Sequence, residues 1–109
     1  VNVRNGQALP DLPETSVVEV PAVIDASGAV PLTMGQMPPQ IRGLIQAVKA
    51  YEELTIQAAI TGNRDTARLA LMAHPLVPSW DVACALLDDI LAANREYLPQ
   101  FAHAETSHV

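Results

Sequence analysis

Aromatic side chains, cysteine and basic residues are all scarce in this sequence. Only 4% of the 109 residues are aromatic although 50% are hydrophobic, so the core must be aliphatic, which suits helix-on-helix packing. The single cysteine, Cys84, excludes an intrachain disulfide and fits a reducing cytoplasm. Twelve acidic residues against six basic ones give a net charge of -6, which disfavours nucleic acid and anionic membranes as partners.

Long apolar runs and a leader segment are also missing. No apolar run approaches the length of a membrane span, and no basic-then-apolar signal segment opens the sequence. We therefore expect a cytoplasmic chain that contacts no membrane. The first residue is Val1 rather than Met, and we expect a fragment cut from a longer protein. The length predicts a single domain over residues 1–109 with one modest core.

Prolines and glycines divide the first third of the sequence into short segments. Residues 1–16 are polar and are predicted to be irregular or extended, because a turn signal at Asn5-Gly6 and two prolines block regular structure. Residues 17–32 predict a short β hairpin. Its first strand is rich in β-branched residues but is interrupted by Pro21, which indicates an edge or a bend.

Three apolar periodicities then predict three helices. They cover residues 39–61, 64–74 and 80–97, and residues 100–109 follow as a flexible tail. Pro39 suits the first turn of the long helix and Gly62 suits its end. Asn63 and Ser79 are expected to cap the two helices that follow. The predicted fold is α+β and mainly helical: an N-terminal extended segment and a short β hairpin, followed by three antiparallel-packed helices.

Cys84 and His74 are the first candidates for chemistry, as a nucleophile with its base or as metal ligands. Cys84 stands among Ala83, Ala85 and Leu86, a setting that favours a buried structural cysteine. His74 directly precedes Pro75 at a helix end, where capping of carbonyl groups is favoured over catalysis.

For the other polar and aromatic residues, a structural role is also favoured over a functional one. Asp88 and Asp89 are adjacent in a helix and point in different directions, so a solvated face is favoured over a cation site. Trp80 could stack on a sugar ring, but anchoring in the core is favoured. The tail residues His103, Glu105 and His108 form a loose cluster that lacks a scaffold for metal. The sequence contains no glycine-rich nucleotide loop and no paired-carboxylate motif, so we expect no catalytic, cofactor or metal residue here.

An ordered set of segments nevertheless resembles the C-terminal portion of glycoside hydrolase family 4, the 6-phospho-glucosidases. The segments, which run from residue 2 to residue 101, are NVRNGQALPDLP, VVEVPAVIDASGAVPL, GLIQAVKAYEELTIQAAITGNRDTARLALMAHPLV and WDVACALLDDILAANREYLPQF. Within the family they look nearer to the 6-phospho-β-glucosidases. Ala22 departs from the family, in which many relatives carry Cys after the VEVP sequence.

The resemblance implies a parent enzyme that uses NAD and a divalent metal, usually manganese, to cleave phosphorylated glycosides by redox elimination. The family's nucleotide loop, metal ligands and tyrosine base lie upstream, so we transfer none of these roles to Cys84, His74, Tyr51 or Tyr97. The resemblance also implies a homo-oligomer. The fragment itself is expected to be inactive, to bind no cofactor and to support the fold and subunit contacts.

Asn5 and the turn that holds Asp25, Ser27 and Gly28 are the candidates for residues near the substrate. For the turn, an ordinary hairpin connection is the simpler interpretation. Two other functions compete with the enzyme fragment. One is a free-standing acidic helical module for protein–protein interaction, and the other is a small hydrolase that uses Cys84 and His74.

Overall fold

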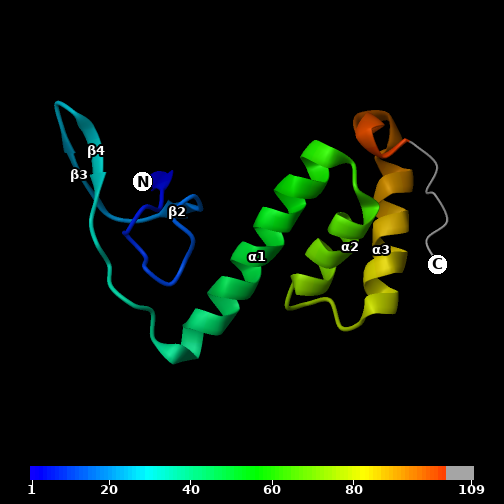
Figure 1. Cartoon of the computed structure of the whole chain (residues 1–109), viewed down its shortest axis with the longest axis horizontal. Helices are drawn as coiled ribbons and strands as arrows, with labels where there is room; N and C mark the ends of the chain where they lie inside the picture. Colours follow the sequence, from blue (N-terminus) through cyan, green and yellow to red (C-terminus); the bar gives the residue numbers. More distant parts are fainter. Residues whose placement is uncertain (103–109) are drawn as a thin grey trace. The chain divides into compact units, whose positions relative to one another are not determined.

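The computed structural model describes residues 1–102, and these form two compact units that are considered separately. Unit 1 comprises residues 1–49 and unit 2 begins at Ala50, so the boundary falls inside the longest helix. The predicted fold class, α+β and mainly helical, is confirmed: short antiparallel strand pairs precede three helices (Figure 1). The expectation of one domain with one core differs from the structure, which has a small core in each unit.

Unit 1 contains two antiparallel strand pairs instead of the one predicted hairpin. Strand β1 (Asn2–Arg4) pairs with β2 (Val17–Glu19), and β3 (Ala22–Asp25) pairs with β4 (Gly28–Pro31). The prediction that residues 1–16 lack regular structure is therefore wrong for β1. The sequence pattern does not indicate this pairing, because each strand is only three residues long and a 12-residue loop separates them.

The core of unit 1 joins the loop between β1 and β2 to the start of helix α1 (Pro39–Thr61). Its buried side chains are Ala8, Leu12, Val18, Val20 and Met37, and Ile45 packs against them from α1. Polar bonds hold the same elements: the amide of Gln46 donates to the carbonyl of Asp11 at 3.0 Å, and the ammonium of Lys49 donates to the carbonyl of Val17 at 2.8 Å.

Asn5 organises the loop between β1 and β2 and is 1% exposed. Its Nδ2 donates to the carbonyl oxygens of Leu9, Leu12 and Pro13 at 2.9–3.0 Å, and its Oδ1 accepts from the N–H of Leu9 at 2.8 Å. Buried loop carbonyls need partners, and burial without one costs about 1–3 kcal/mol per group. One side-chain amide thus replaces the ladder that this irregular segment cannot form.

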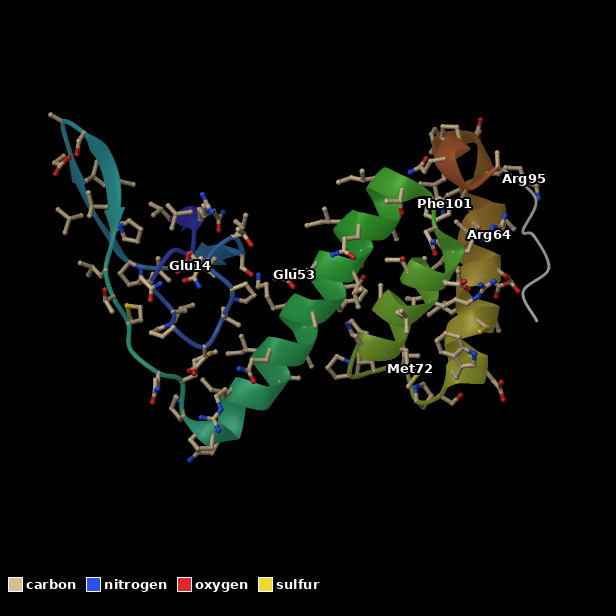
Figure 2. The ribbon with its side chains drawn as sticks, viewed as in Figure 1. Glu14, Glu53, Arg64, Met72, Arg95 and Phe101 are labelled. Carbon is tan, nitrogen blue, oxygen red and sulfur yellow. The ribbon has the colours of Figure 1, made fainter. Side chains whose placement is uncertain are left out.

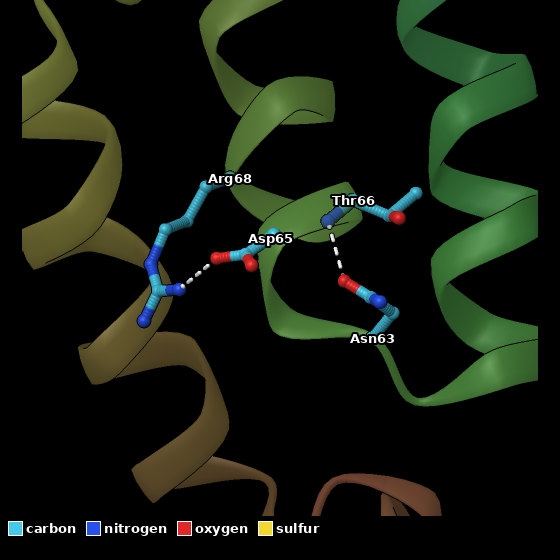
Figure 3. A network of polar contacts seen from close by, with 4 residues as sticks. All are labelled: Asn63, Asp65, Thr66 and Arg68. Atoms are coloured by element: carbon cyan, nitrogen blue, oxygen red, sulfur yellow. Dashed lines mark hydrogen bonds and ion pairs between the residues drawn. The ribbon is translucent and has the colours of Figure 1, made fainter. Parts of the chain in front are cut away.

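Unit 2 packs the second half of α1 against α2 (Arg64–Ala73) and α3 (Trp80–Ala93), which lie side by side in Figure 1. The buried residues Ala58, Ala67, Leu87 and Phe101 form its core. Two of these four are alanines, whose small side chains permit close helix approach. The predicted caps are confirmed. Asn63 Oδ1 accepts from the N–H of Thr66 at 3.0 Å (Figure 3), and Ser79 Oγ accepts from the N–H of Val82 at 3.2 Å.

The end of the described chain differs from the prediction. The third helix stops at Ala93 rather than residue 97. Asn94 leaves the helical conformation, with a φ of -116° and a ψ of 19°, and its side chain donates to the carbonyl of Ile90. Two short 3-10 helices follow, η1 (Arg95–Tyr97) and η2 (Pro99–Phe101). Phe101 is buried, so the predicted flexible tail is wrong at its first residues. The rest of that prediction lies outside the described residues.

Gly62 fixes the corner between α1 and α2. Its φ of 71° is in the left-handed region that favours glycine, and a Cβ there would overlap the backbone carbonyl of Gln100 in η2. The same corner is bonded to η2 from both sides: Gln100 Nε2 donates to the carbonyl of Ala59 at 2.9 Å, and Arg64 Nη2 donates to that of Phe101 at 2.9 Å.

The buried amide generates a first prediction. Asn5→Ala should lower the opening free energy of the loop by roughly 2 kcal/mol, because it leaves buried backbone groups without partners. Asn5→Asp should cost more, since it places a carboxylate oxygen against carbonyl oxygens. Amide hydrogen exchange at Leu9 and Val18 measures the effect. The control is Gln7→Ala, which removes only an exposed bond to Glu14 and should change little. Equal exchange in Asn5→Ala and Gln7→Ala would contradict this role.

A pair of glycines in α1 and at its end generates a second prediction. Gly62→Ala should destabilise unit 2 by about 2 kcal/mol or more, from left-handed strain and the clash with Gln100. Gly43→Ala should have the opposite sign and stabilise α1 by about 0.5–1 kcal/mol, because nothing lies within 4 Å of its added Cβ. Urea unfolding followed by helical circular dichroism measures both, and a neutral Gly62→Ala would refute the corner contact.

Candidate functional site

The turn between β3 and β4 holds three of the four residues predicted near substrate. Asp25 Oδ1 accepts from the hydroxyl and the N–H of Ser27, at 2.6 and 2.8 Å, and Gly28 has a φ of 109°. The Ser27 hydroxyl, then its N–H, hold the pKa of Asp25 below its ordinary value, against a small opposing effect of burial. The turn is exposed. It can offer a carboxylate and a hydroxyl to a polar ligand.

Asn5 does not join this turn through its hydrogen bonds. Its side-chain partners are Leu9, Leu12 and Pro13, whereas the bonds of Asp25 remain within the turn. With both amide atoms occupied and 1% of the residue exposed, Asn5 can affect a ligand through the shape of its loop. The four predicted residues therefore form one exposed polar turn and one buried structural amide.

Unit 2 contains a groove of mixed polar and apolar lining that the sequence did not reveal. The groove has a volume of about 480 Å³ and is lined by Arg64, Arg95 and Asp88 around Leu98 and Phe101, and Figure 2 shows the two arginines at the same end of the unit as Phe101. The arginines are far apart in sequence and belong to no motif. Asp88 offsets one of the two guanidinium charges, and Arg64 already donates to the carbonyl of Phe101.

Cys84 and His74 do not form a catalytic pair within residues 1–102. Cys84 is half-buried rather than fully buried as predicted. His74 is the C-cap of α2, but its ring donates to no carbonyl: Nδ1 accepts from the N–H of Leu76 at 3.1 Å, and the ring meets Tyr51 edge-on at 4.8 Å. The predicted capping by the side chain is thus replaced by capping through its backbone.

Trp80 is not the core anchor that was favoured from the sequence. It is 46% exposed and occupies the first position of α3, two turns before the core residue Leu87 on the same helix face. Asp88 and Asp89 are both exposed, in agreement with a solvated face. The cluster of His103, Glu105 and His108 lies outside the described residues.

The described residues do not fit a metal or a dinucleotide. No three His, Cys, Asp or Glu side chains gather within residues 1–102, and no strand there runs through a glycine-rich turn into a helix. Over the same residues, no helix is both long enough and apolar enough to cross a membrane.

Comparison with known proteins identifies the family. Residues 1–77 match the model of the family 4 glycosyl hydrolase C-terminal domain. A probable 6-phospho-beta-glucosidase of Bacillus subtilis is 44% identical over 101 residues, which are 93% of this chain and 23% of that protein. The 6-phospho-beta-glucosidase BglT of Thermotoga maritima is 39% identical over 98 residues, 90% of this chain and 24% of that protein.

Solved structures agree with the sequence matches. The Thermotoga maritima 6-phospho-beta glucosidase, solved with manganese, NAD+ and glucose-6-phosphate, superposes with a TM-score of 0.78 at 38% identity, over 89% of this chain and 24% of that one. A 6-phospho-alpha-glucosidase from gut microorganisms, solved with NAD and glucose-6-phosphate, gives 0.84 at 34% identity, over 91% of this chain and 22% of that one. The chain spans less than a quarter of the length of these relatives, and it belongs to glycosyl hydrolase family 4, as a C-terminal portion that matches the model of the family's C-terminal domain over residues 1–77.

Proposed function

We propose that this chain is the C-terminal part of a longer 6-phospho-β-glucosidase-like enzyme that cleaves phosphorylated glycosides in the cytoplasm. The observation that carries the proposal is the 44% identity to the probable 6-phospho-beta-glucosidase of Bacillus subtilis over 93% of this chain. The β-linked substrate class is supported by the lower identity, 34%, to the 6-phospho-alpha-glucosidase from gut microorganisms. The family cleaves by an NAD-dependent route rather than with two carboxylates.

NAD and manganese belong, in this proposal, to the part of the enzyme upstream of Val1. A relative of this chain has been solved with both groups, and no three His, Cys, Asp or Glu side chains gather to hold a metal within residues 1–102. The role of the present segment is non-catalytic. It forms one wall of the substrate domain, and it positions the polar turn of Asp25, Ser27 and Gly28 near the phosphorylated sugar. Asn5 contributes by holding its loop in shape.

Contacts between copies of the enzyme are the second part of the proposed role. Large apolar side chains are exposed on unit 2, among them Ile56 and Ile60 on one face of α1 and Leu76 after α2. Side chains four residues apart on a helix cover the same face, and an exposed apolar face of this kind marks an interaction surface. We therefore propose a homo-oligomer.

A free-standing interaction module is the rival function. The exposed apolar side chains of unit 2 suit such a module as well as a subunit contact. Family membership over residues 1–77 favours the enzyme fragment.

An activity assay tests the enzyme. The whole protein should hydrolyse p-nitrophenyl β-glucoside 6-phosphate only with NAD and manganese present, and EDTA should abolish the activity. It should act poorly on the same glucoside without the phosphate. The 109-residue chain should be inactive alone. Hydrolysis by that chain, or equal hydrolysis by the EDTA-treated whole protein, would contradict the proposal.

Light scattering tests the subunit contact. The whole protein should elute as an oligomer, and Ile56→Lys combined with Ile60→Lys should shift its mass toward that of the monomer, because two charges enter an apolar interface. The control is Gln57→Lys, at an exposed position between them. An unchanged mass in the double variant would exclude this face of α1 from the interface.

A further inference from the structure

The backbone hydrogen bonds between β1 and β2 show which edge of β2 faces β1. The Val1 amine donates to the carbonyl of Val20 at 2.8 Å, and the N–H of Val20 donates back to the carbonyl of Val1 at 3.0 Å. The N–H of Asn5 donates to the carbonyl of Ser16. Antiparallel ladders use every second residue, so the even-numbered residues 16, 18 and 20 direct their backbone groups toward β1.

The pairing of β3 with β4 uses the other edge. The N–H of Leu32 donates to the carbonyl of Pro21 at 3.0 Å, and Val23 stands opposite Val30. By the same alternation, the odd-numbered residues 21, 23 and 25 direct their backbone groups toward β4. β2 and β3 are separate strands on either side of Pro21. Their ladders use residues of opposite parity: β1 pairs along the even-numbered residues and β4 along the odd-numbered ones.

This arrangement leaves one edge of β3 without a strand partner within residues 1–102. The pair β3–β4 is two-stranded there, and the backbone groups of Ala22 and Ile24 point away from β4. Both faces of the pair are apolar and exposed: Val23 and Val30 on one face are 53% and 48% exposed, and Ile24 on the other is 67% exposed. A two-stranded ribbon is marginally stable in water, and an apolar edge invites another strand.

We infer that this edge of β3 is filled by the residues that immediately precede Val1 in the whole protein, so that β1 extends into a longer strand. The inference rests on the proposed function, in which this chain is the C-terminal part of a longer enzyme. The register carries it: since Val1 opposes Val20, the second residue before Val1 opposes Ala22 and the fourth opposes Ile24. Because the upstream residues belong to the same chain as β3, their effective concentration at this edge is higher than that of a strand from a second copy. The product is a three-stranded sheet whose far end holds the turn of Asp25.

Cysteine cross-linking in the whole protein tests this register. The third residue before Val1 opposes Val23 in a pair without mutual hydrogen bonds, where Cα atoms lie about 4.5 Å apart, within disulfide range. Cysteine at that residue, combined with Val23→Cys, should form an intramolecular disulfide on mild oxidation, detected by peptide mapping. The reference pair is Asn2→Cys with Glu19→Cys, which are partners of the same type in the observed ladder.

The matched control moves the upstream cysteine by one position. At the second residue before Val1 the side chain points to the opposite face, so its disulfide with Val23→Cys should form at least tenfold less. Equal yields from both positions, or no disulfide where the reference pair forms one, would overturn the inference. A disulfide between two copies would do the same, because the edge would then belong to an oligomer contact.

Proline substitution gives a second measurement that needs no disulfide. Proline at the second residue before Val1 removes the N–H that bonds Ala22 and should lower the melting temperature of the whole protein. Proline at the third residue removes an N–H directed away from β3 and should lower it less. The reverse order would refute the extended strand. Activity of the unsubstituted protein remains a separate test, so the enzyme can be confirmed while the strand fails.

Discussion

The hydrogen bonds of the Asn5 side chain are the interaction on which unit 1 depends. The loop after β1 cannot form a ladder, and the buried amide donates to its carbonyl groups instead. Side chains also bond irregular backbone in unit 2, at the corner after α1, where Gln100 and Arg64 donate to backbone carbonyls. Both cores are small and contain alanine, so their burial alone contributes little. Polar side chains that satisfy irregular backbone therefore determine where the loops lie.

The edge of β3 that faces away from β4 has no such polar side chain bonded to its backbone groups among residues 1–102. Ala22 and Ile24 direct backbone groups to a side with no strand among residues 1–102, and the surrounding side chains are apolar. In unit 2, the α1 side chains Ile56 and Ile60 are likewise apolar and exposed. The chain spans less than a quarter of the length of its relatives, and in the proposed whole enzyme the upstream residues and the other subunits cover these surfaces.

Local chemistry predicted the helices well. Gly62 ends α1, and Asn63 and Ser79 cap the next two helices, since caps and stops depend on neighbours within three or four residues. Contacts between distant residues were not predictable. The bond from Gln100 to Ala59 spans 41 residues. For the candidate site, the sequence indicated the polar turn of Asp25 but gave no sign that Asn5 is buried, because burial depends on the path of the whole loop.

Residue-resolved amide hydrogen exchange in the whole protein is the measurement that tests the central claim most directly, namely that upstream polypeptide completes this segment. The N–H groups of Leu9 and Val20 have partners in the structure and serve as internal references for slow exchange. The claim predicts that Ala22 and Ile24 exchange as slowly as these references. Fast exchange at Ala22 and Ile24 beside slow exchange at Leu9 and Val20 would contradict it.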